Sequence, residues 1–100
     1  MSLSGITPGP WVVREVKGLG LPGQVGYAID FNADQEQVVD YVYEKSDAYL
    51  IAAAPDLLEA LKDLTADISD RFDMNSPSTN PGIKFCIQRA EAAIAKALGQ

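Results

Sequence analysis

The chain of 100 residues contains no histidine and a single cysteine. Without histidine it lacks the side chain that most often serves as a general base and as a metal ligand. The single cysteine, Cys86, cannot form a disulfide within the chain, which suits a reducing compartment. It also has no histidine to activate it as a nucleophile. We therefore predict a protein that is not an enzyme and holds neither a metal nor a cofactor.

Basic clusters and long apolar runs are also missing. Eight lysines and arginines are scattered among fourteen acidic residues, which gives a net charge of −6. Nucleic-acid binding depends on clustered basic residues, so direct DNA or RNA binding is not expected. No apolar run approaches the roughly 18 to 20 residues that span a bilayer, and no signal peptide opens the chain. We expect a cytoplasmic protein without membrane contact.

What is present begins with β-strand patterns. Trp11–Lys17 is rich in β-branched residues, and residues 25–31 alternate large apolar residues with small or polar ones. Gln37–Tyr43 predicts a third strand, with Val38 and Val42 on one face and Val39, Tyr41 and Tyr43 on the other. The short connections indicate an antiparallel meander, one face of which lies against helices.

The strongest periodic signal runs from Ser46 to Phe72 and predicts an amphipathic helix with Ser46 as its N-cap. Its apolar stripe consists of Ile51, Ala54, Leu58, Leu61, Thr65, Ile68 and Phe72, widened by Leu50, Leu57 and Leu64. Pro55 interrupts this stripe. Either one helix kinks there, or a short helix of about residues 46–53 ends and a second begins at the proline. Asp56 and Glu59 after the proline favour two pieces, because acidic residues suit a first helical turn.

A polar loop over residues 73–82 precedes a last helix, in which Asn80 is the expected cap and Pro81 the first residue. Its apolar positions are Ile83, Ile87, Ala90, Ile94 and Leu98, and Gly99 ends it. Cys86 is expected to be buried on this helix.

These elements predict a single α+β domain over residues 1–100. A three-stranded antiparallel sheet is followed by a broken central helix, and a C-terminal helix packs as a helical hairpin against it. The segments are an irregular stretch (1–10), the β meander (11–43), the broken helix (46–72), the loop (73–82) and the C-terminal helix (83–98).

Two motifs carry a family resemblance: TPGPW at residues 7–11, and LIAAAPDLLEAL at residues 50–61. Together with the alanine-rich end, RAEAAIAKAL, they resemble a family of short proteins encoded by tailed phages and prophages. The resemblance spans nearly the whole chain. It implies an origin in a phage or a bacterial host carrying one, and it transfers no functional residue.

The favoured function is that of a non-enzymatic phage accessory protein that binds another protein. Aromatic residues dominate interface hot spots, and Tyr41 and Tyr43 are the candidate contact residues on whichever sheet face the helices leave open. One alternative is a small enzyme or ligand-binding protein that uses the glycine-rich loop 18–24 and nearby carboxylates. A pocket lined by acidic residues would favour the enzyme, whereas an apolar patch would favour the binding module.

A second alternative is an acidic DNA mimic. It would use the carboxylates spaced along the central helix: Asp56, Glu59, Asp63, Asp67 and Asp70. Solvation of that helix face is the simpler interpretation of the same row. We also predict a homodimer, formed through the uncovered sheet face or the free edge strand, because the apolar surface exceeds what these elements cover. The competing prediction is a monomer whose exposed face binds a host or phage partner.

Overall fold

The computed structural model describes residues 6–17 and 23–100. The chain divides into two compact units, Met1–Asp56 and Leu57–Gln100. Their elements, in chain order, are β1 (Val12–Lys17), β2 (Val25–Asp30), β3 (Gln37–Val42), α1 (Lys45–Ala52), α2 (Ala54–Arg71) and α3 (Pro81–Ala97). The α+β class and the order of elements are confirmed. That the whole chain is a single domain stays a prediction.

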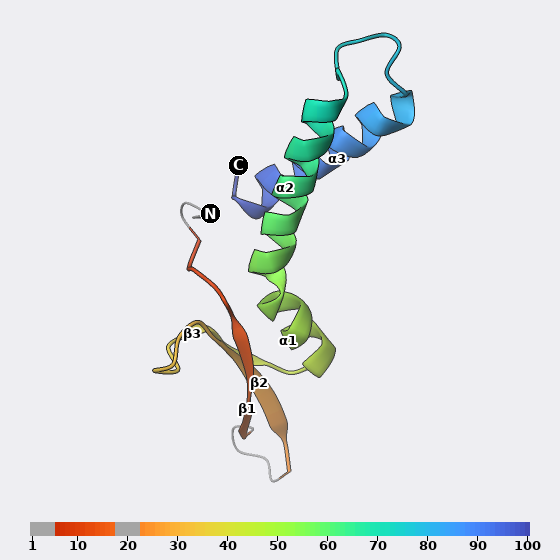
Figure 1. Ribbon diagram of the computed structural model, residues 1–100. Coiled ribbons are helices and arrows are strands. Elements are labelled where there is room, and N and C mark those ends of the chain that lie inside the picture. Colours follow the sequence, from red (N-terminus) through yellow and green to blue (C-terminus); the bar gives the residue numbers. More distant parts are fainter. Residues whose placement is uncertain (1–5, 18–22) are drawn as a thin grey trace. The chain divides into compact units, whose positions relative to one another are not determined.

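The sheet is antiparallel in the order β1-β2-β3, so β2 is its central strand (Figure 1). Tyr27 pairs with Val42 and Ile29 with Val39, so two steps on β2 match three on β3. Such a bulge places Val39 and Val42 on the same face. The prediction that Val39 lies on the face opposite Val42 is therefore wrong, because strict alternation does not pass through a bulge.

Both faces of β2 are covered. Ile29 is fully buried, and so is Ala28, which points to the other face. Gly26 and Asp30, on the face of Ala28, are buried as well. The alternation of residues 25–31 had indicated one buried face. A central strand differs because large side chains from both neighbouring strands close over its small residues.

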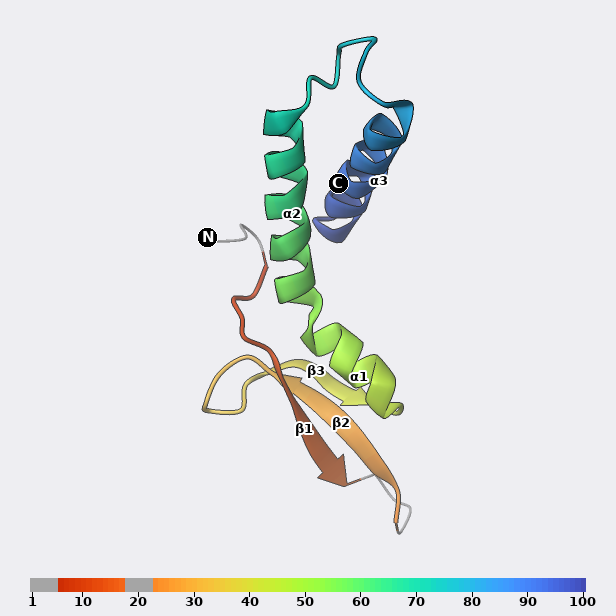
Figure 2. The same ribbon diagram turned by 45° about the vertical axis from the view of Figure 1, so that its right-hand side comes forward.

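Helix α1 lies against this sheet (Figure 2), and its Ala48 is fully buried. The helix begins at Lys45, after Glu44, whose side chain makes no capping hydrogen bond. Ser46 as the N-cap is therefore wrong. The first turn is closed instead by the backbone, where the amide of Ala48 donates to the carbonyl of Glu44 at 3.1 Å.

The central helix is broken into two pieces, as the acidic residues after the proline favoured. α1 ends at Ala52, Ala53 forms a turn, and α2 begins at Ala54. Pro55 lies in the first turn of α2, where its missing N–H would have no helical partner. Pro55 is buried, and a Cβ placed on Gly9 would lie 3.6 Å from the Pro55 Cβ. The two motifs of the family resemblance therefore meet at the helix break.

The second unit is a helical hairpin, in which α2 and α3 run in opposite directions (Figure 2). The predicted cap is confirmed: Oδ1 of Asn80 accepts a hydrogen bond from the Gly82 amide at 2.7 Å, and Pro81 is the first residue of α3. Gly99 follows the helix with a φ of 76°, a conformation that favours glycine.

Burial in the hairpin is selective. Leu58 (8% exposed), Thr65 (7%) and Ile87 (5%) are buried. Cys86, expected to be buried, is exposed. It lies one position beside Ile87, at the edge of the surface that α3 turns toward α2. In the part of the chain that the structure describes, no helix is both long and apolar enough to cross a membrane.

Candidate functional site

The predicted contact residues Tyr41, on β3, and Tyr43, just after the end of β3, lie against each other. Their ring centroids lie 5.0 Å apart at an interplanar angle of 74°, an edge-to-face pair. A Cβ on Gly26 would overlap the ring of Tyr41, so this ring lies directly over the glycine. Tyr43 remains 72% exposed. Gly26 leaves room for the ring of Tyr41, and the ring of Tyr41 packs against the exposed ring of Tyr43.

A polar network adjoins this pair, on the face that carries Gly26 and Ala28. Arg14 donates to both carboxylate oxygens of Asp30, from Nε to Oδ2 at 2.7 Å and from Nη2 to Oδ1 at 3.2 Å. The Asp30 side chain is only 8% exposed, and the two hydrogen bonds from Arg14 offset the cost of removing its carboxylate from water. The hydrogen bond to Asp30 and the attraction of its charge raise the pKa of Arg14 above its usual value, and burial opposes them.

Gln37, the first residue of β3, extends the network to Asp40 on the same strand. With its amide turned to suit both neighbours, its oxygen accepts from Nη2 of Arg14 at 2.9 Å and its nitrogen donates to Oδ1 of Asp40 at 2.7 Å. The network and the tyrosine pair together form what we call the aromatic face, made of Arg14, Gly26, Asp30, Gln37, Asp40, Tyr41 and Tyr43. It offers exposed aromatic surface beside groups whose polar atoms are held in place.

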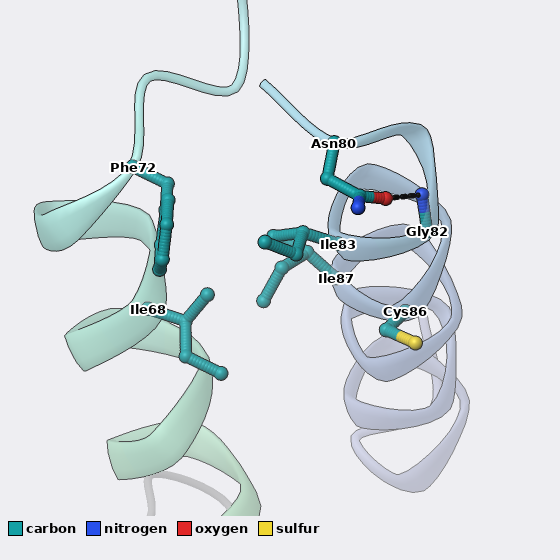
Figure 3. Close-up of a pocket in the computed structure, with 7 residues that line it drawn as sticks. All are labelled: Ile68, Phe72, Asn80, Gly82, Ile83, Cys86 and Ile87. Atoms are coloured by element: carbon teal, nitrogen blue, oxygen red, sulfur yellow. Dashed lines mark hydrogen bonds between the residues drawn. The ribbon is translucent and has the colours of Figure 1, made fainter.

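A second feature is an apolar pocket of about 450 Å³ in the hairpin. Its seven lining residues are Ile68, Phe72, Asn80, Gly82, Ile83, Cys86 and Ile87. In Figure 3 the side chains of Ile83 and Ile87 point from α3 toward α2, across from Ile68 and Phe72. None of the seven side chains is acidic, so the pocket is not the carboxylate-lined kind described for the enzyme alternative.

The remaining predicted features are the loop 18–24 and the acidic row of α2. Of the loop 18–24, residues 18–22 lie outside the described residues. On α2 the carboxylates of Asp56, Asp63 and Asp70 are exposed, and Asp67 pairs with Arg71 at 3.0 Å. Among the residues that the structure describes, no group of three or more potential ligands could hold a metal ion.

Sequence reasoning found the tyrosine pair but missed the polar network and the pocket. A glycine inside a strand signals the close approach of another group, and charged residues inside two paired strands signal an ion pair. Gly26, Arg14 and Asp30 therefore held usable signals. The pocket held none, because its isoleucines show the same helical spacing as core residues.

Comparison with known protein families gives a match over the whole sequence. The sequence matches the family model described as Salmonella phage P22 protein Y8K6 over residues 1–100. Neither the curated proteins nor the solved structures gave a match. The resemblance first indicated by TPGPW and LIAAAPDLLEAL is thus confirmed over the full length, and the chain belongs to the family of phage P22 protein Y8K6.

Proposed function

We propose that this phage-family protein is a non-enzymatic accessory protein that binds another protein through its aromatic face, in the cytoplasm of the bacterial host. The partner belongs to the phage or to the host. The observation that supports this most is the exposed ring of Tyr43 on the ring of Tyr41, which is itself seated on Gly26.

The energetic argument is preorganisation. Tyrosine supplies a large contact area with few rotatable bonds, and hot spots in interfaces are enriched in it. The edge-to-face contact restricts the Tyr43 ring before any partner arrives, so less conformational entropy is lost on binding. The Arg14 network fixes polar groups beside the ring, which favours a partner that presents hydrogen-bonding groups around an apolar centre.

The test is affinity capture from a lysate of the bacterial host, with and without phage proteins, on tagged wild type and Tyr43→Ala. Tyr49→Ala is the matched control, because Tyr49 is 56% exposed on α1 and has Lys45 rather than another aromatic ring beside it. We expect one protein to be captured by wild type and by Tyr49→Ala, and to be lost with Tyr43→Ala.

Both variants should keep the wild-type midpoint of chemical denaturation, which shows that the loss is not unfolding. Capture that survives Tyr43→Ala, or that both variants lose equally, would contradict the aromatic face as the binding surface.

A further inference from the structure

The hairpin carries a second surface, separate from the aromatic face. On α2, Leu57 (54% exposed) and Leu64 (57%) lie two helical turns apart and thus on one side. Leu64 comes one position before the buried Thr65. α2 therefore has more apolar width than α3 covers.

The corresponding edge of α3 is apolar and composed of small residues. Cys86 comes one position before the buried Ile87, and Ala93 and Ala97 continue its line along the helix; all three are exposed. In an antiparallel pair, residues one position before the inward-facing ones lie on the same side of both helices, because both helices are right-handed. The exposed leucines of α2 and this alanine edge therefore form one open side of the hairpin.

The two helices that border the open side have opposite charge. α2 has five acidic and two basic residues, a net charge of −3, and α3 has three basic and one acidic residue, a net charge of +2. Among the described residues the ion pairs are Arg14–Asp30 and Asp67–Arg71, so the basic groups of α3 pair with no α2 carboxylate. Arg89 instead lies over the ring of Phe85.

The charges follow the open side in matching positions. Asp67 comes three residues after Leu64, Arg89 three after Cys86, and Lys96 three after Ala93. Each charged residue therefore lies about one helical turn from an exposed residue of the open side and next to it on the helix surface. Asp67 pairs with Arg71 on its own helix, but the exposed Asp56, Asp63 and Asp70 lie on the same flank of α2. The margin of α2 is therefore mainly acidic, and that of α3 is basic.

We propose that the open side binds the open side of a second copy, forming a two-fold four-helix bundle in which each α2 packs against the partner's α3. Two such stackings are possible. If the two-fold axis ran perpendicular to the helices, the acidic α2 of one copy would lie against the acidic α2 of the other. If the axis runs parallel to the helices, the α2 of each copy lies against the basic α3 of the other. Both arrangements keep neighbouring helices antiparallel, as in helical bundles, so the opposite charges of α2 and α3 select the second.

Size-exclusion chromatography with light scattering at tens of micromolar tests this arrangement. Wild type elutes at twice the chain mass of 10.7 kDa. Arg89→Glu/Lys96→Glu makes both margins acidic, and Ala60→Lys/Asp67→Lys makes both basic, so each variant alone is monomeric. An equimolar mixture restores a dimer of one chain of each kind, because every margin again faces an opposite charge.

Lys17→Glu/Lys45→Glu, which has the same charge change on the first unit, stays dimeric. Labelling of the Cys86 thiol is slower in wild type than in the monomeric variants, since the open side is covered. A monomeric wild type, a dimer that both margin variants retain, or a mixture that stays monomeric would each overturn the proposal. The aromatic face is untouched by these substitutions, so capture through Tyr43 is tested independently.

Discussion

At the scale of single residues, the sheet depends on a size match between β2 and its neighbours. Gly26 leaves room for the ring of Tyr41, and Ala28 is fully buried opposite Arg14. Asp30 is nearly buried because Arg14 satisfies both of its oxygens. The small and acidic residues of β2 are thus the ones that let the aromatic face form.

Gly26→Ala tests the close contact between Gly26 and the ring of Tyr41. The new methyl group would overlap the ring, and overpacking of this kind costs about 1–3 kcal/mol of unfolding free energy. In a Tyr41→Ala background the same change should be neutral or stabilising, because alanine loses less backbone entropy than glycine. Urea denaturation of the four proteins measures the difference, and equal destabilisation in both backgrounds would refute the contact.

Leu58→Ala tests the buried side of α2. Leu58 is 8% exposed, so its truncation leaves a cavity and should cost about 2–5 kcal/mol. Leu50→Ala is the control, because Leu50 is 64% exposed on α1 and should change stability by about 0.5 kcal/mol or less. Denaturation midpoints that fall equally in the two variants would contradict the assigned burial.

At the scale of elements, helix boundaries follow local chemistry wherever a side chain supplies it. Asn80 and Pro81 start α3, and Gly99 ends it. Pro55 marks the first turn of α2. The start of α1 has no such side-chain cap, and there the N-cap is Glu44, two residues before the predicted Ser46.

Asn80→Ala tests the cap of α3. The Gly82 amide loses its acceptor, so the variant should lose about 0.5–2 kcal/mol of stability. Asn75→Ala serves as the control, since Asn75 is an exposed residue of the same loop whose backbone amide, not its side chain, is hydrogen-bonded to Asp73. Thermal unfolding followed by circular dichroism should show a lower midpoint for Asn80→Ala alone.

At the scale of the whole molecule, two compact units present two different surfaces. The first unit carries the aromatic face, and the second carries the open side of the hairpin. A protein with a partner surface on one unit and a self-association surface on the other would present two copies of the first surface. Avidity toward a repetitive phage or host structure would follow from such a dimer.

The purified protein should contain no stoichiometric zinc. Structural zinc sites use cysteine and histidine, and this chain has one cysteine and no histidine. Elemental analysis after metal-free purification measures the content. A ratio near one zinc per chain would contradict the expectation and require carboxylate ligation.

The sequence by itself determined what short-range chemistry controls. The three strands, the break before Pro55, the Asn80 cap and the tyrosine pair all follow from residues that are near one another in the chain. In each case the free energy that selects the structure comes from a local hydrogen bond, a backbone preference or the period of the apolar residues.

Only the tertiary structure decided the rest. The bulge put Val39 beside Val42, the strand register joined Arg14 to Asp30, and the position of α3 on α2 left Cys86 exposed and the pocket open. These outcomes depend on strand register and on the packing of two helices, which are set by contacts between residues far apart in the chain. Periodicity fixes which face of an element is apolar, but it contains no information on how much of that face a distant element will cover.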